Sequence, residues 1–129
     1  MSKHKANIDV VAAVIKKNDL FLIANRSFDA NSREIWEFPG GKVEENEIFT
    51  SALTREIKEE LSLNIKVGNK IATIHLNKTD KNIYVHYYYA IIVSGQISLN
   101  VHSEFKWVQH AQLKNFTYID GDRHFLDNL

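Results

Sequence analysis

Three glutamates on one predicted helix carry the strongest chemical signal in this sequence. Apolar residues recur with helical spacing and predict a helix over residues 50–61. At about 100° per residue, Glu56, Glu59 and Glu60 lie within an arc of roughly 100° on that helix. Three carboxylates on one face supply the hard oxygen ligands that Mg²⁺ combines with water and substrate phosphates. The pattern therefore predicts phosphoryl chemistry.

The position of Glu60 decides between this interpretation and a simpler one. A solvated charged face, with Arg55 and Glu59 as an i,i+4 ion pair worth ~0.2–0.5 kcal/mol, would explain most of the charges. Glu60, however, projects between Leu53 and Phe49 on the apolar stripe, where an unpaired carboxylate is costly to desolvate. A cation beside Glu60 removes that cost.

Other catalytic and metal chemistries lack the residues they need. The chain has no cysteine, which excludes thiolate zinc sites, a cysteine nucleophile and disulfides. Its six histidines show no HExxH spacing, and there is no GxSxG element of the kind that carries a serine nucleophile. A zinc site and a serine hydrolase are therefore disfavoured.

Composition limits the size of the protein and the class of its partners. At 129 residues the chain is long enough for one sizeable core, so we expect a single domain over residues 1–129. Basic and acidic residues number 16 each, so no net charge attracts a nucleic-acid polymer or an anionic membrane. No apolar run approaches the ~20 residues that span a bilayer, and the N-terminus is too polar for a signal sequence. We expect a cytoplasmic monomer or homodimer with a small-molecule partner.

Strands are expected on both sides of the acidic helix. Two hairpins are predicted, one over residues 9–15 and 20–24 and the other over residues 64–75 and 83–93. Further short strands are expected over residues 97–99 and 105–108. This order predicts an α/β (α+β) sandwich with a mixed β-sheet packed between helices.

The remaining segments are predicted as turns, loops and short helices. Residues 26–33 are polar and loop-like, and Pro39-Gly40-Gly41 predicts a tight, specialised turn. The N-cap of the acidic helix is expected at Asn46, Phe49 or Thr50. Short helices are expected over residues 110–115 and 123–129.

The residues around the glycine turn and the acidic helix resemble the Nudix box. Gly41 is followed after five residues by Glu47, and after seven more by the run Arg55-Glu56-Ile57-Lys58-Glu59-Glu60. Six fixed identities, at average residue frequencies near ~0.07, would coincide about once in ten million placements. Similarity to the MutT branch of the family extends from about Asp9 to the C-terminus.

The resemblance implies a role for each residue of the box. The cofactor would be Mg²⁺, with Mn²⁺ as an alternative, and Glu56 would also be a candidate base for the attacking water. The implied metal ligands are three carboxylates and one backbone carbonyl: Glu56, Glu59, Glu60 and Gly40. Gly41 would be structural, and the Glu47–Arg55 ion pair would fix the loop to the helix.

Basic residues outside the helix are implied to contact the phosphates. Arg26 and Lys42 match basic positions that do so in the MutT branch, and they flank the glycine turn. Lys81, in the polar turn of the second hairpin, is a further candidate. As solitary basic residues they would more often be solvated surface groups.

The resemblance also places the base of a bound nucleotide. Asp122 matches the position at which the branch reads the purine edge, and Asp120 is its rival. A turn or helix-capping aspartate is the alternative interpretation of either residue. Stacking on the base is expected from Phe38 or Tyr118.

Two positions depart from the family pattern. Ser62 stands where the box has glycine, and a left-handed backbone there costs a non-glycine residue ~1–2 kcal/mol. Val101 stands where the branch places another metal-binding glutamate. Glu104 is the nearest replacement carboxylate, and its alternative interpretation is a surface strand residue.

The resemblance implies hydrolysis of a nucleoside triphosphate to a nucleoside monophosphate and pyrophosphate. Nucleotides like 8-oxo-dGTP and dGTP are the favoured substrates, and a CTP-type pyrimidine nucleotide is the nearest alternative. A non-catalytic Nudix-fold module that binds a nucleotide, and an acidic-helix interaction domain without a ligand, are the alternatives from other classes.

Overall fold

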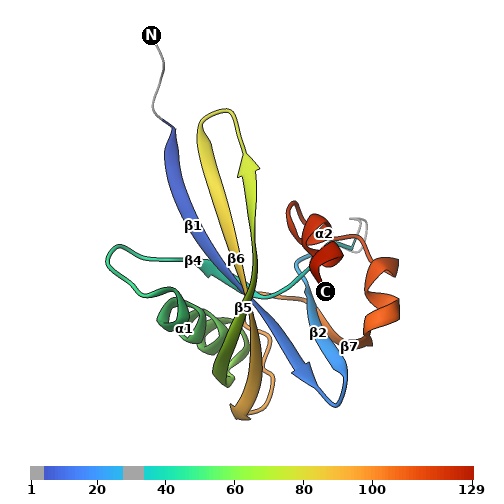
Figure 1. The fold of residues 1–129 in the computed structure, drawn as a ribbon. Helices are drawn as coiled ribbons and strands as arrows, with labels where there is room; N and C mark the ends of the chain where they lie inside the picture. The colour runs from blue at the N-terminus through green and yellow to red at the C-terminus, as the bar shows by residue number, and fades with distance from the viewer. Residues whose placement is uncertain (1–4, 28–33) are drawn as a thin grey trace.

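The computed structural model describes residues 5–27 and 34–129, which form a set of strands with one long helix packed beside them and short helical segments near the C-terminus (Figure 1). In chain order the elements are β1 (Ala6–Lys17), β2 (Leu20–Asn25), β3 (Trp36–Glu37), β4 (Gly40–Lys42), α1 (Phe49–Leu61), β5 (Asn64–Asn77), β6 (Lys81–Ser94), β7 (Glu104–Gln109), the 3-10 helix η1 (His110–Asn115), α2 (Asp122–Phe125) and the 3-10 helix η2 (Leu126–Asn128). No helix in these two ranges is long and apolar enough to cross a membrane.

The strands form one mixed sheet in which β1 joins two halves. The strand order is β3-β2-β1-β6-β5, with β4 added to β1 and β7 added to β2. Strands β1 and β6 are parallel, whereas the other pairings are antiparallel. Most of β1 pairs with β6, and only Lys16 and Lys17 at its end pair with β2. The predicted mixed sheet is therefore confirmed.

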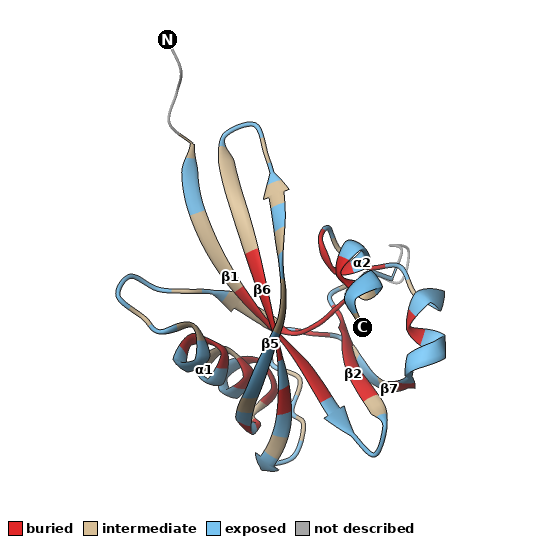
Figure 2. Ribbon diagram, viewed as in Figure 1, coloured by how far each residue is buried: buried red, intermediate tan, exposed pale blue. Residues whose placement is uncertain are grey.

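Strand β1 is apolar on both faces because helices cover both faces. Val11, Ala13 and Ile15 pack with the buried residues of α1, in a cluster that we call the box-side core. Ala12 and Val14 point the other way and pack with residues of η1 and α2, in a cluster that we call the C-terminal core. Figure 2 shows β1 buried where these layers meet. The sheet thus lies between helices, as predicted.

Both predicted hairpins are confirmed. In the first, Asn18 and Asp19 adopt left-handed backbones with φ of 50° and 65°, the pattern of a two-residue type I′ turn that matches the twist of the strands. In the second, β5 and β6 are each 14 residues long, and three residues connect them. Arg26 and Ser27 follow β2 outside any strand. The rest of the predicted polar loop, residues 28–33, lies outside the described residues.

Helix α1 begins one residue earlier than predicted, and the predicted N-caps are wrong. The N-cap is Ile48, whose extended backbone precedes the helix and whose side chain makes no capping hydrogen bond. Asn46 instead occupies a left-handed turn with φ of 62°. The burial of Ala52, Leu53 and Ile57 against β1, and not a capping side chain, sets the phase of the helix.

The strand predicted over residues 97–99 is not formed, because that segment satisfies the C-terminus of α1. The amides of Ser98 and Asn100 donate to the carbonyls of Leu61 and Glu60 at 2.9 and 3.1 Å. The Asn100 side-chain amide donates to the Glu59 carbonyl at 2.7 Å. These contacts replace the intrahelical partners that a helix end lacks. The apolar side chains of the segment still pack on the box-side core, which explains why they imitate a strand.

Ser62 ends the helix in the left-handed conformation expected from its place in the box. Its φ is 59° and its ψ is 31°, and its amide donates to the Lys58 carbonyl at 3.1 Å. The Asn100 side chain donates to the Ser62 hydroxyl at 3.2 Å, which offsets part of the backbone strain. The serine is therefore tolerated and not optimal.

We expect Ser62→Gly to raise the free energy of unfolding by up to about 1 kcal/mol, because glycine adopts this backbone without a Cβ clash. Urea denaturation measures the change. Ser51→Gly is the matched control within α1, and it should lower the same quantity by roughly 0.5 kcal/mol. A loss of stability in Ser62→Gly would show that the hydrogen bond to Asn100 outweighs the strain.

Candidate active site

A cleft of about 250 Å³ lies between β1, the β3–β4 turn and the loop before α2. Its lining includes seven residues that the sequence singled out: Arg26, Phe38, Gly40, Gly41, Lys42, Asp120 and Asp122. Val10, Ala12 and Val85 give it an apolar wall. The structure therefore gathers predicted phosphate, metal and base residues from four separate parts of the chain.

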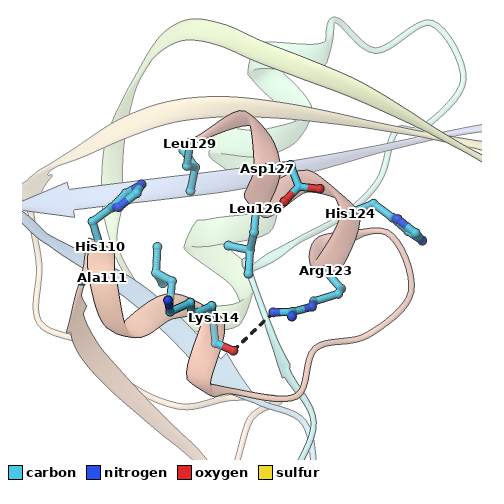
Figure 3. Close-up of a pocket in the computed structure, with 9 residues that line it drawn as sticks. His110, Ala111, Lys114, Arg123, His124, Leu126, Asp127 and Leu129 are labelled. Carbon is cyan, nitrogen blue, oxygen red and sulfur yellow. Dashed lines mark hydrogen bonds between the residues drawn. The ribbon is translucent and has the colours of Figure 1, made fainter.

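A larger hollow of about 630 Å³ lies elsewhere, between η1 and the C-terminal helical segments. Figure 3 shows its basic side chains, among them His110, Lys114 and Arg123, over an apolar floor that includes Leu126. The Arg123 guanidinium donates to the Lys114 carbonyl at 3.3 Å. No residue of the box lines this hollow, whereas Gly40, Gly41 and Lys42 line the smaller cleft, which is therefore the candidate active site despite its size.

Gly40 and Gly41 were predicted to belong to a tight turn, and they instead begin strand β4. This segment, for which we keep the name glycine turn, lies against both β1 and α1. A Cβ on Gly40 would lie 1.9 Å from the Val11 carbonyl oxygen, and a Cβ on Gly41 would lie 2.4 Å from the Glu56 carboxylate. At Gly40 the neighbour is backbone, so no side chain fits there, and at Gly41 a side chain would displace the Glu56 carboxylate from its place against β4. The close approach of the turn to the Glu56 carboxylate therefore requires glycine at both positions.

Arg55 ties the loop to the helix as the box predicts. Its Nε and Nη2 donate to the two oxygens of Glu47 at 2.8 and 2.9 Å, and Nη2 also donates to the Lys42 carbonyl at 3.2 Å. The hydrogen bonds from Arg55 lower the pKa of Glu47 to about 2. Nη1 donates to Glu56 at 2.9 Å, so the same guanidinium orients a box carboxylate.

The three helix glutamates differ in exposure. The Glu59 side chain is largely exposed and lies 3.4 Å from Arg55. Glu56 is held between Arg55 and the glycine turn. Glu60 retains only 5% exposure, as its place on the apolar stripe predicts. The carboxylates thus run from solvent into the core along one side of α1.

Glu60 is a buried carboxylate with an incomplete set of partners. Its Oε2 lies 3.6 Å from Arg26 Nη2, whereas its Oε1 is buried and makes no hydrogen bond within the described residues. Burial raises the pKa of Glu60 to about 7. A divalent cation bound to the free oxygen would give that oxygen a partner and would stabilise the charged carboxylate against its burial. This donor set therefore fits a hard metal ion.

Two further buried residues that the sequence did not single out complete the surroundings of Glu60. His102 Nε2 lies 2.7 Å from Glu37 Oε2, and Arg26 Nε lies 2.7 Å from the same oxygen. Glu37, Glu60 and His102 each offer a ligand atom, and these atoms lie within 4.8 Å of one another. Glu37 precedes the glycine turn and His102 follows Val101. Their closeness in sequence to these two features is the one signal that could have identified them.

Glu104 lies apart from this cluster in the structure. It begins β7 opposite Asn25, and its Oε1 accepts a hydrogen bond from the Asn25 side chain at 3.3 Å. Val101 is 40% exposed. The arrangement favours the interpretation of Glu104 as a strand residue.

Asp122 is buried and connects three elements. Its Oδ2 accepts the Phe38 amide at 2.9 Å, and its Oδ1 accepts the Tyr87 hydroxyl. Burial raises the pKa of Asp122 to about 7. The N-cap of α2 is Gly121, without a side-chain capping bond, so the capping interpretation of Asp122 is wrong. Its rival Asp120 has an exposed side chain and pairs with Lys78 at 2.7 Å.

The predicted stacking residues are partners of each other. The Phe38 and Tyr118 rings stack with centroids 6.0 Å apart and planes 10° apart. Both rings belong to the C-terminal core, but only Phe38 also lines the cleft, and the Tyr118 hydroxyl donates to the Leu113 carbonyl at 2.6 Å. Lys81 begins β6 beside Ala6, away from the residues that line the cleft.

Comparison with known proteins settles the family. The NUDIX domain model matches residues 5–129. The chain belongs to the NUDIX family. It is similar to the CTP pyrophosphohydrolase of Escherichia coli (strain K12), 29% identical over 120 residues that cover 93% of this chain and 89% of that protein. It is also similar to the 8-oxo-dGTP diphosphatase of Buchnera aphidicola subsp. Schizaphis graminum (strain Sg), 32% identical over 124 residues that cover 93% of this chain and 90% of that protein.

Solved structures agree with the NUDIX assignment. The solution structure of the E. coli ORF135 protein matches with a TM-score of 0.86 and 28% identity, covering 96% of this chain and 89% of that chain. The crystal structure of the MutT protein from Methanosarcina mazei Go1 matches with a TM-score of 0.81 and 27% identity, covering 98% and 94%. The family and fold predicted from the sequence are confirmed, and this NUDIX protein is a hydrolase.

We expect the stability of this NUDIX protein to fall as the pH rises from about 4 to 7. The folded pKa of Asp122, about 7, lies above the ordinary aspartate value of 3.8. The stabilising contribution is therefore complete below the unfolded pKa and is lost as the pH rises through the folded one. Asp122→Asn should reduce the decline in unfolding free energy between pH 5 and pH 8 by at least about 1 kcal/mol.

Urea denaturation at the two pH values measures this change. Asp120→Asn is the matched control, because its side chain is exposed, and the decline should persist in that variant. An unchanged decline in Asp122→Asn would show that the carboxyl ionises normally in the folded protein.

Proposed function

We propose that the chain hydrolyses a nucleoside triphosphate to a nucleoside monophosphate and pyrophosphate. The preferred substrates are nucleotides like 8-oxo-dGTP and dGTP, and Mg²⁺ is the cofactor, with Mn²⁺ as an alternative. The observation that carries the proposal is the buried Glu60 carboxylate, which has one unpartnered oxygen, Oε1, and whose other oxygen lies 3.6 Å from Arg26, a residue that lines the cleft. A protein that needed no cation would gain stability from an apolar residue at this position.

The metal ligands of this proposal are Glu56, Glu59, Glu60 and the Gly40 carbonyl. When bound, Mg²⁺ supplies neutralisation of the phosphate charge and acidifies the attacking water. Arg55 keeps one of these carboxylates oriented through the 2.9 Å hydrogen bond to Glu56. The surrounding apolar side chains limit the access of bulk water to Glu60.

Arg26 and Lys42 are the proposed phosphate ligands. Both line the cleft, one at the end of β2 and the other at the end of β4. Arg26 is half-exposed, so its guanidinium can reach a ligand in the cleft. A guanidinium binds phosphate oxygens through paired charge-assisted hydrogen bonds.

The base is proposed to lie against the apolar wall of the cleft, near Phe38 and Asp122. An acidic side chain accepts hydrogen bonds from a guanine-type N–H, and a protonated one also donates. Both types of substrate have support from the relatives, since one is named for 8-oxo-dGTP and another for CTP. We favour the purine because Asp122 lines the cleft as an acid and not as an amide.

A non-catalytic nucleotide-binding module is the second candidate function. Such a protein has no need of three helix carboxylates, and all three are present here. Metal-dependent release of pyrophosphate from 8-oxo-dGTP, dGTP and CTP, with EDTA as the control, separates the two. Tight nucleotide binding without release would favour the module.

Glu60→Gln and Glu56→Gln should each lower kcat at least ~10²-fold, the usual cost of removing one charge-stabilising group. The same Glu60 variant should not lose stability, since glutamine removes the buried charge. Steady-state kinetics and thermal denaturation measure the two effects. Glu45→Gln is the matched control, because Glu45 is an exposed glutamate in the loop before α1, and this variant should keep wild-type turnover. Wild-type turnover in both helix variants would show that the reaction does not depend on these two glutamates.

Asp122→Ala should change substrate preference more than overall activity. Loss of a base contact costs ~1–3 kcal/mol in kcat/KM for the substrate that makes it and spares the others. Comparing 8-oxo-dGTP, dGTP and CTP measures this selectivity. A uniform loss for all three substrates would identify Asp122 as a residue that only connects α2 to the glycine turn.

A further inference from the structure

Arg26 approaches the cleft on a long side chain that the fold must hold in place. It follows the last residue of β2, and its amide donates to the Ile35 carbonyl at 3.0 Å, so its backbone is fixed. Its side chain is 47% exposed. An arginine side chain loses up to about 2 kcal/mol of rotamer entropy when it is ordered. A residue that orders Arg26 before the ligand arrives would therefore strengthen binding.

Glu37 binds one edge of the Arg26 guanidinium. Its Oε2 lies 2.7 Å from Arg26 Nε, and its side chain is 5% exposed. Glu37 lies on β3 opposite Ala24 of β2, so both ends of the ion pair are attached to neighbouring strands. Because the contact is made at Nε, the two outer amino groups of Arg26 are left for other partners.

His102 in turn holds Glu37. Its side chain is completely buried, and its Nε2 lies 2.7 Å from the same Glu37 oxygen. Its other ring nitrogen is buried without a hydrogen-bond partner in the described part of the chain. A buried polar atom without a partner costs free energy, so the histidine is not placed here for stability alone. The contact with Glu37 gives the histidine a role in fixing the position of that carboxylate.

The far edge of the guanidinium faces the box carboxylate. Arg26 Nη2 lies 3.6 Å from Glu60 Oε2, close enough for attraction and too long for a full hydrogen bond. We propose that Glu37 and His102 are positioning residues, which hold Arg26 with its outer amino groups toward the phosphates of a nucleotide bound next to Glu60. This inference rests on the proposed phosphate-binding role of Arg26.

The same contacts distinguish this role from that of a metal ligand. Glu37 Oε2 already accepts two donors, and one of them belongs to a permanently charged guanidinium. A cation on that oxygen would lie against Arg26 and be repelled. Glu60 has a free oxygen and does not share this restriction. The cluster therefore divides into a carboxylate that anchors an arginine and a carboxylate that is available to the metal.

A double-mutant cycle on Arg26 and Glu37 tests the proposal. The readout is the affinity for inorganic pyrophosphate in Mg²⁺, measured by titration calorimetry, together with kcat and KM for the nucleotide that the wild type hydrolyses. We expect Arg26→Ala to weaken pyrophosphate binding about tenfold or more, the usual scale for losing charge-assisted hydrogen bonds. Glu37→Gln should weaken binding several-fold and raise KM more than it lowers kcat. The double variant should bind no more weakly than Arg26→Ala.

His102 provides an independent pair of variants. His102→Phe removes the donor to Glu37 and should weaken pyrophosphate binding, whereas His102→Gln keeps an N–H donor and should restore most of it. Glu34→Gln is the matched control, because Glu34 accepts a hydrogen bond from the Trp36 indole at 3.3 Å and shares no hydrogen bond or ion pair with Arg26 in the described part of the chain. Its affinity for pyrophosphate should equal that of the wild type. Thermal denaturation confirms that each compared variant is folded, and the His102 pair decides the question if Glu37→Gln does not fold.

Three outcomes would overturn the inference in different ways. Full additivity of Glu37→Gln and Arg26→Ala would show that Glu37 does not act through Arg26. Equal binding by His102→Phe and His102→Gln would remove His102 from the chain of contacts. An unchanged affinity in Arg26→Ala would refute the proposed phosphate role itself, and the inference would fall with it.

Discussion

A carboxylate held inside the protein is the constraint that the surrounding structure must satisfy. Glu60 cannot move to solvent, because the carbonyls of Glu59, Glu60 and Leu61 at the end of α1 are bound by Ser98 and Asn100. Arg55 fixes the helix to the loop that precedes it. The helix is thus attached near its middle and at its C-terminal end while it holds an acidic group among apolar side chains. A buried charge that cannot rotate away must be paired or neutralised, and this requirement explains why Arg26 and the cleft lie beside it.

The parts of this fold that are governed by local spacing were predictable from sequence. The phase of α1 follows from the apolar residues that recur along it, and the first hairpin follows from Asn18-Asp19, whose left-handed backbones suit a two-residue turn. The box spacing placed Gly41, Glu47 and Arg55 in one arrangement. Residues 97–99 were predicted wrongly because alternating apolar residues indicate a strand even when their backbone serves a helix end.

The interactions that the sequence could not reveal connect residues far apart in the chain. Glu37 and His102 are 65 positions apart, and no local pattern relates a glutamate before a turn to a histidine after a loop. Asp122 was selected from a resemblance, but its bonds to the Phe38 amide and the Tyr87 hydroxyl depend on how α2 packs on the sheet. Polar pairs of this kind are set by tertiary packing. They can be identified in a single sequence only once the fold is known.

The parallel pairing of β1 with β6 also sets the order in which the protein can assemble. Asn7 and Asn82, which are direct partners in that pairing, are 75 positions apart in the chain. During synthesis β1 must therefore wait for most of the chain before its partner strand exists, and contacts of such separation form slowly. Until then its Val11–Ile15 stretch, buried on both faces in the finished protein, lacks its partner along the β6 edge. The nascent chain is consequently most prone to aggregation before β6 has emerged, and the glycine turn, which docks on β1, acquires its final geometry late in folding.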